Sequence, residues 1–291
     1  MRYFPTPYPD ELLGSVLIRA CHHLGLPPAS LVKVLEDGSS DLFYLYPSFF
    51  QGLSRLTNLS SSDLLLRHTV FPYAAIGLPT KRRALLEREL LTATARGNSV
   101  RLRAALGLHL EDLSRRRFCK QCRDEECKQI GESYWHRLHA LPGVFVCPEH
   151  SEPLCVSGIS VLPKLSNVNA KLPQEVDGSP VDWGLDAHTL QRLAAVVLES
   201  IALPAETWND VSIEYQRYAM KIGAENRQCR WDVQQCVLDF NRLYGEVFLH
   251  KVGLQLTSVG SDAWPARLAN GASSSPLLQL RHILLRLFLK F

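Results

Sequence analysis

The chain reads Cys119-Lys120-Gln121-Cys122 and, 24 residues later, Cys147-Pro148-Glu149-His150. Each quartet carries two metal-ligand side chains separated by two residues, the spacing of paired knuckles that close on one tetrahedral zinc ion. Three thiolates and one imidazole would leave no position for a reactive water, so the pattern predicts a structural Zn²⁺ rather than a hydrolytic one. The predicted ligands are Cys119, Cys122, Cys147 and His150. The alternative, ordinary buried thiols and a surface histidine, is disfavoured by the repeated pairing.

The residues between the two quartets are more numerous than a zinc ribbon usually holds, so an additional element is expected there. Tyr134, Leu138 and Leu141 recur at the i, i+4, i+7 spacing of an amphipathic helix, which Pro142 would end. Residues 144–146 are apolar and predict a short strand that leads into the second quartet.

Composition sets the broad class of the protein. Hydrophobic residues make up 46% of the 291 residues, which is ordinary for a soluble protein. No apolar run is long enough to form a membrane span, and prolines at positions 5, 7 and 9 interrupt any signal-peptide pattern. The eight cysteines suit a reducing cytosol better than a disulfide framework. We therefore expect a cytoplasmic protein with no membrane partner.

The remaining patterns are almost all helical, so the predicted fold class is mainly α. Helices are expected at residues 12–24, from 28 onward, and at 48–57, 61–68, 80–96, 186–201, 206–222, 230–248 and 276–291. Four segments are predicted: an N-terminal helical, helix-turn-helix-like unit at 1–116, a zinc module at 117–156, a connecting segment at 157–185 and a C-terminal helical domain at 186–291.

The first two predicted helices could form a helix-turn-helix unit that reads DNA. The alternative is a plain helical hairpin that belongs to the core. Lys33 is the one basic residue of the second helix. A helix with so little positive charge is poorly suited to a DNA groove, which favours the hairpin and a protein-binding role.

Positive charge is concentrated in residues 79–120, which hold eleven Lys and Arg against four Asp and Glu, although the whole chain carries only +3. A local excess of this kind attracts phosphates. A solvated helix face explains the charge equally well. The candidate DNA-phosphate contacts are Lys81, Arg82, Arg83, Arg115, Arg116 and Arg117.

Three separated motifs, in the same order, resemble the TniQ/TnsD family of bacterial transposon target-selection proteins. They lie at residues 2–13, residues 68–72 and the zinc segment. The zinc-segment positions that carry the resemblance are Cys119, Cys122, Gly131, Glu132, Tyr134, Trp135, Leu141, Pro142, Cys147, Pro148 and His150. Two departures are Lys120, where the family usually has proline, and Ser151, where it usually has glycine.

This resemblance implies a non-enzymatic adaptor of the bacterial cytoplasm. Such a protein marks a double-stranded DNA target and recruits the AAA+ ATPase TnsC, which licenses the transposase. Short relatives serve CRISPR-associated transposons, so a guide-RNA effector complex is a further expected partner. Among the residues themselves, no phosphate loop, nucleophile elbow or paired-carboxylate motif stands out. The rival interpretation is a zinc-finger DNA-binding transcriptional regulator.

The proline-rich start of the chain cannot form a helix, so its aromatic side chains need a surface to cover them. Tyr3, Phe4 and Tyr8 either fold back on the first helix or anchor a partner. The resemblance favours the partner role, because in the family this region is associated with TnsC.

Overall fold

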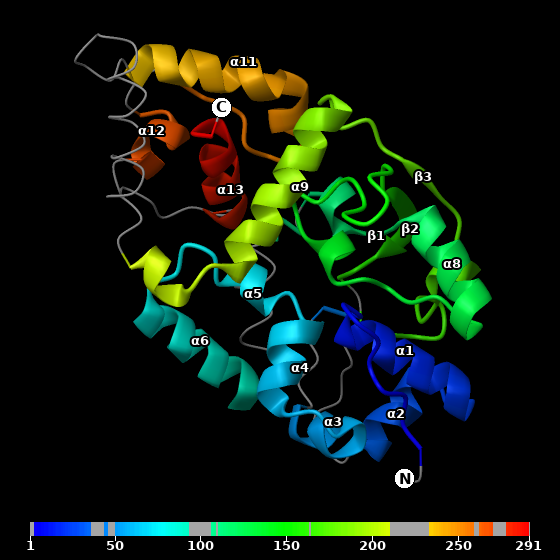
Figure 1. Ribbon diagram of the computed structural model, residues 1–291. Helices are drawn as coiled ribbons and strands as arrows, with labels where there is room; N and C mark the ends of the chain where they lie inside the picture. Colours follow the sequence, from blue (N-terminus) through cyan, green and yellow to red (C-terminus); the bar gives the residue numbers. More distant parts are fainter. Residues whose placement is uncertain are drawn as a thin grey trace.

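A computed structural model describes residues 3–35, 44–45, 50–92, 106–108, 110–162, 164–209, 233–258, 262–269 and 278–290. The fold is mainly helical, as predicted, and it also contains one small sheet that was not predicted (Figure 1). The α-helices are α1 (Leu13–Leu24), α2 (Pro28–Val34), α3 (Phe50–Thr57), α4 (Ser61–His68), α5 (Phe71–Ala74), α6 (Thr80–Thr92), α8 (Lys120–Ile130), α9 (Ala187–Ala202), α11 (Val233–Lys251), α12 (Trp264–Ala269) and α13 (Leu278–Phe288). The strands are β1 (Arg115–Phe118), β2 (Cys155–Ser160) and β3 (Gly178–Pro180). Four 3₁₀ turns are η1 (Asp112–Ser114), η2 (Leu138–Ala140), η3 (Pro173–Glu175) and η4 (Ala205–Trp208).

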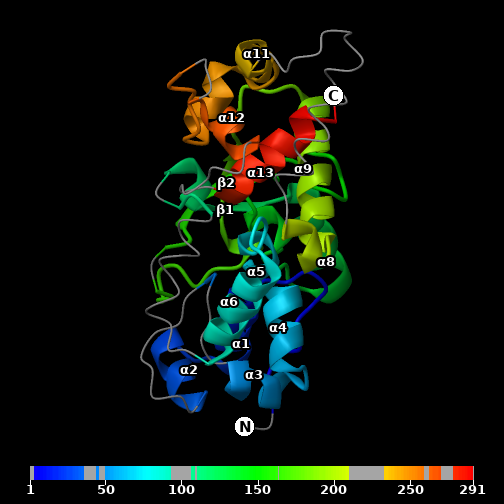
Figure 2. The same cartoon turned by 90° about the vertical axis from the view of Figure 1, so that its left-hand side faces the viewer.

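Helix α9 joins the parts of the molecule, because it packs on α5 of the N-terminal helices and on α13 of the C-terminal helices. In the view of Figure 1 it crosses the middle, with the sheet and α8 to one side, and in the view of Figure 2 it runs along the right-hand part of the molecule. One continuous apolar core contains Leu17, Phe145 and Leu284, so all parts share it. The four predicted segments therefore contact one another, and their boundaries stay a prediction.

Most predicted helices are confirmed, because their apolar stripes face this core. Helix α4 begins after Ser60, whose side chain accepts a hydrogen bond from the Asp63 amide, and α1 ends at Gly25 with a φ of 63°. The helix predicted at 206–222 lies outside the described residues from 210 onward. The helix-turn-helix-like use of α1 and α2 stays a prediction. Within the described ranges, no helix has both the length and the apolar character that a membrane span requires.

The predicted connecting segment, residues 157–185, does more than connect. It supplies most of β2 and all of β3. Together with β1 these strands form an antiparallel sheet in the order β1-β2-β3. Trp183 then stacks on Phe145 with ring centroids 3.8 Å apart. Strands β2 and β3 are short and contain Gly and Ser, and β1 is almost entirely arginine, so the three strands lack the alternating apolar pattern that would have predicted them.

The amphipathic helix predicted around residues 134–141 is wrong. Residues 133–136 form no helix, and residues 135–137 pair with the arm that precedes α1 just before the turn η2. The Leu12 amide donates to the Trp135 carbonyl at 2.9 Å, and the Arg137 amide donates to the Asp10 carbonyl at 2.6 Å. Pairing with a segment over 120 residues away overrides the local periodicity. The additional element of the loop is instead α8, whose polar sequence carries no apolar stripe.

Trp135 lies at the centre of this junction and is fully buried. Its amide donates to Ser15 Oγ at 3.0 Å, and its indole Nε1–H donates to the Lys171 carbonyl at 2.8 Å. The edge of its ring meets Tyr44 and Phe118. We call residues 10–12 and 132–137, with the side chains between them, the seam.

A buried ionic cluster closes the seam on one side. Arg19 donates to Glu11 and to Glu132, both at 2.8 Å, and Glu11 has no exposed surface. Burial raises the pKa of the Glu11 carboxyl to about 7, although Arg19 acts in the opposite direction. The folded protein therefore holds a proton on Glu11 at pH values where the unfolded chain has released it.

This difference predicts a pH dependence of stability. Between the ordinary pKa of 4.5 and the folded value of about 7, the unfolded chain binds fewer protons at Glu11, so stability falls as pH rises through this window. We measure the free energy of unfolding by chemical denaturation at each pH. Across this window it should fall by up to about 3 kcal/mol more in the wild type than in Glu11→Gln. Parallel stability curves for the two proteins would contradict the assignment to Glu11.

Candidate metal centre

The four predicted metal ligands converge at one point. The ligand atoms of Cys119, Cys122, Cys147 and His150 all lie within 4.8 Å of one another. His150 Nδ1 is 3.3 Å from the Cys122 sulfur and 3.6 Å from each of the other two sulfurs. Thiolates about 2.3 Å from a tetrahedral ion are about 3.8 Å apart, so these separations suit such an ion. The cluster could hold one metal ion.

The first knuckle is the start of α8. Cys119 is the N-cap residue, with an extended φ of −91°, and Cys122 lies in the first turn. Hydrogen bonds from Cys122 and Cys147 hold the pKa of the Cys119 thiol far below its usual range. The positive end of the helix dipole also favours negative charge here. Of the three sulfurs, Cys119 is therefore the one favoured in the ionised form that binds metal, because the same shared hydrogen bonds raise the pKa of the Cys122 and Cys147 thiols.

The second knuckle is a tight turn. The Cys147 amide donates to the Glu152 carbonyl, and the Ser151 amide donates to the Cys147 carbonyl, both at 2.8 Å. The strand predicted at residues 144–146 is reduced to one isolated bridge between Val146 and Pro153. Ser151 has a φ of 57°, in the left-handed region that favours glycine. This geometry accounts for the glycine that the resembling family usually has at the position.

Glu125 orients His150 from behind. Its carboxylate lies 3.3 Å from His150 Nε2, so it can hold the Nε2 proton and leave the Nδ1 lone pair directed at the sulfurs. The sequence analysis missed this residue. A signal existed, because Glu125 follows Cys122 by three residues and would share its helix face, but α8 was not predicted.

The predicted DNA contacts divide into accessible and buried groups. Lys81 and Arg82 are exposed in the first turn of α6, and Arg83 is half-buried with its guanidinium 5.7 Å from the Phe71 ring centroid. Arg115 is half-buried and forms an ion pair with Glu111 at 2.9 Å. Lys81 and Arg82 are thus the best placed to meet an external phosphate.

The prediction that Arg116 and Arg117 face DNA is wrong, because only 1% and 2% of their surfaces are exposed. The register of β1 shifts between Arg115 and Arg117, so consecutive side chains both point inward. The Arg116 guanidinium lies 4.0 Å from the Tyr44 ring centroid. Arg117 donates to the carbonyls of His139 and Leu141. Arg117 thus ties β1 to the turn η2, whereas the guanidinium nitrogens of Arg116 are buried with no hydrogen-bond partner among the described residues and face the rings of Tyr44 and Trp135.

The aromatic arm docks largely on its own chain. Phe4 is buried, and Tyr8 stacks on Tyr134 with ring centroids 5.1 Å apart. Buried Phe4 cannot be a partner anchor while the arm stays docked, so the prediction is corrected for it, whereas for half-buried Tyr8 the partner role stays a prediction. Tyr3 differs, because it is 52% exposed and its hydroxyl bonds His23 Nδ1 at 2.8 Å.

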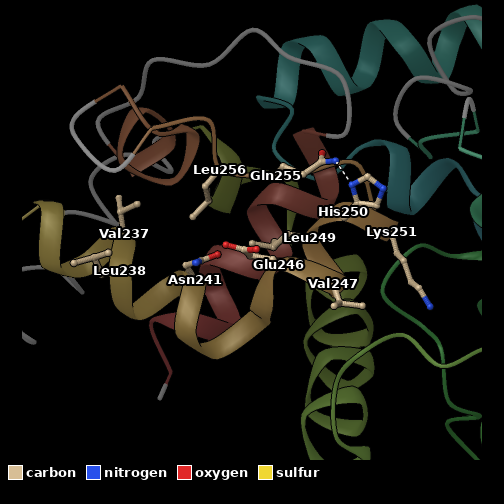
Figure 3. A pocket seen from close by; sticks show the side chains of 10 residues that line it. All are labelled: Val237, Leu238, Asn241, Glu246, Val247, Leu249, His250, Lys251, Gln255 and Leu256. Atoms are coloured by element: carbon tan, nitrogen blue, oxygen red, sulfur yellow. Dashed lines mark hydrogen bonds between the residues drawn. The ribbon is translucent and has the colours of Figure 1, made fainter.

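A separate cavity of about 610 Å³ lies along α11 (Figure 3). Its lining mixes apolar side chains such as Val237 and Leu256 with polar ones such as Gln255, which bonds His250 at 2.7 Å. None of its lining residues belongs to a metal-ligand cluster within the described part of the chain. The candidate site therefore stays at the two knuckles.

Two comparisons with known proteins bear on this site. The sequence model of the TniQ family matches residues 2–154, which include the arm, α1 to α6 and both knuckles. The Tn7 transposition protein TnsD of Escherichia coli is 28% identical over 156 residues. That match covers 52% of this chain and 30% of the length of TnsD.

Loss of one ligand should act through metal retention and folding. We expect Cys147→Ser to lose the bound metal and to lower Tm, because a structural metal supplies folding energy. Cys127→Ser is the matched control, since Cys127 is a half-buried cysteine of α8 outside the cluster. Metal analysis and thermal melting check both variants. An unchanged Tm and metal content in Cys147→Ser would contradict the assignment.

Proposed function

The chain belongs to the TniQ family, and we propose that it selects the DNA target for a transposon by recruiting the ATPase TnsC to that target. The family match over residues 2–154 carries this proposal. The similarity to TnsD, a Tn7 transposition protein, supports the same process. In this role the chain is a non-catalytic adaptor.

The proposed metal is one structural Zn²⁺. Three sulfurs and one imidazole form a donor set that zinc favours, and the four side chains complete a tetrahedral shell without a water. Zinc bound there would fix both ends of the loop that contains the seam residues 132–137. The ion would serve the adaptor by keeping its parts in one arrangement.

Helix α6 is the proposed DNA contact. Lys81 and Arg82 lie in its first turn, where the helix dipole repels their charge, so an external anion would relieve that repulsion. Contacts of this kind supply affinity and position without reading bases. Target identity would then come from a partner or from chain beyond the matched region.

The proposed contact with TnsC includes Tyr3. Its ring is half exposed at the end of a docked arm, and a tyrosine anchor loses few torsions on binding. Because Phe4 and Tyr8 belong to the fold, the substitution Tyr3→Ser tests the contact more cleanly than removal of the arm. Tm should stay unchanged in this variant while TnsC binding weakens.

A pull-down of tagged chain with TnsC, with and without ATP and DNA, tests the proposal directly. We expect TnsC to be retained, and retained less by Tyr3→Ser, whereas Arg67→Ser, an exposed control on α4, should behave as wild type. Absence of TnsC under every condition would contradict the adaptor role and favour the zinc-finger regulator. Retention of a CRISPR guide-RNA complex in the same experiment would identify RNA-guided targeting.

DNA binding should depend steeply on salt. The double variant Lys81→Ala/Arg82→Ala should weaken binding about equally on all sequences and reduce the salt slope by about 2. Arg242→Ala, an exposed arginine of α11 far from α6, serves as the control (Figure 1). Fluorescence anisotropy across a salt series measures both effects. Equal slopes for the two variants would exclude α6 as the contact.

A further inference from the structure

A cavity of about 320 Å³ lies directly beside the four-ligand cluster, between α8 and the seam. Carboxylates and imidazoles dominate its lining, and Cys122 also reaches it. The ionisable side chains that line it are Asp10, Glu125, Glu126, Glu149, His136, His139 and His150. Its members come from four separate stretches of the chain, so no local sequence motif contains them all.

We propose that this cavity binds a second divalent transition-metal ion through Glu126 and His136. Glu126 Oε1 and His136 Nε2 are 2.5 Å apart, and both lie within 4.8 Å of the Cys122 sulfur. Imidazole and carboxylate together suit borderline ions such as Zn²⁺, Co²⁺ and Ni²⁺. A small outward shift of either side chain would admit an ion between the two atoms.

His136 is oriented for this role. Asp10 Oδ2 lies 3.8 Å from its Nδ1, on the side of the ring away from Glu126, and a carboxylate in this place can draw near to the distal proton of a metal-binding imidazole. The imidazole ring stacks on Tyr134 with centroids 4.6 Å apart. Asp10 is itself fixed by the Arg137 side chain at 2.9 Å and the Leu138 amide at 3.0 Å. When the ion takes Nε2, the proton can occupy Nδ1 beside Asp10.

His139 supplies an independent indication of a ligand. Only 2% of its surface is exposed, it lines the same cavity, and its Nδ1 has no hydrogen-bond partner in the described part of the chain. A buried polar atom left in this state is costly. The ring centroids of His139 and His136 are 4.7 Å apart, so a water bound to the second ion could form a hydrogen bond with His139 Nδ1.

The charge of the cavity favours a cation. If the first site holds zinc as proposed, three thiolates against one dication leave that centre with a formal charge of about −1. Glu126 and Asp10 add negative charge next to it. Only the charge of the first centre rests on the proposed zinc, and the side-chain contacts of the cavity do not. A second dication would offset the net negative charge of the first centre and these carboxylates.

Metal stoichiometry tests the inference. Protein that carries one zinc is titrated with Co²⁺, and bound metals are counted by mass spectrometry after gel filtration. We expect one additional ion in the wild type. Loss of even an outer partner of a metal ligand costs about 10- to 100-fold in affinity, so removing a direct ligand in Glu126→Gln or His136→Gln should weaken binding of the second ion at least tenfold.

Glu152→Gln is the matched control, because this exposed glutamate of the second knuckle does not line the cavity. It should keep the second ion. If each variant retains the first zinc, its fold is intact. Loss of the second ion alone can then be told apart from failure of the first site. A wild type that takes up no additional ion, or equal uptake by Glu126→Gln and Glu152→Gln, would overturn it.

Discussion

The backbone pairing of the seam is the interaction on which the rest of the structure depends. The Leu12 amide meets the Trp135 carbonyl, and the Arg137 amide meets the Asp10 carbonyl. Buried Trp135 and the Arg19 ion pairs cover this contact and exclude water from it. Breaking the backbone hydrogen bonds would therefore leave buried polar groups without partners, which is costly. Because one knuckle precedes residues 132–137 and the other follows them, metal at the knuckles would fix both ends of the seam strand.

This arrangement relates the metal centre to the proposed function. One side of the seam, residues 10–12, belongs to the arm and leads into α1, and the other side, residues 132–137, belongs to the loop between the knuckles. The TniQ family match, residues 2–154, covers both sides together. A metal site that does not itself contact DNA or TnsC could therefore still affect the proposed binding of both, because it would fix the position of the N-terminal helices.

Sequence patterns predicted the features whose cause is local. Ligand spacing identified the four cysteine and histidine positions, and apolar stripes identified most helices. The patterns failed where distant contacts decide. Arg116 and Arg117 are buried beside a register shift in β1, and the arm pairs with residues 135–137, which form no helix. Likewise, Glu125 and the Glu126–His136 pair gain their meaning only once α8 and the seam are adjacent.

Hydrogen exchange of the Leu12 amide, with and without removal of metal by a chelator, tests the central claim most directly. This amide lies outside the knuckles and is protected by the Trp135 carbonyl. If the knuckles hold the seam, removal of metal should accelerate exchange at Leu12 together with residues 119–150. Faster exchange confined to residues 119–150, with Leu12 unchanged, would contradict the account.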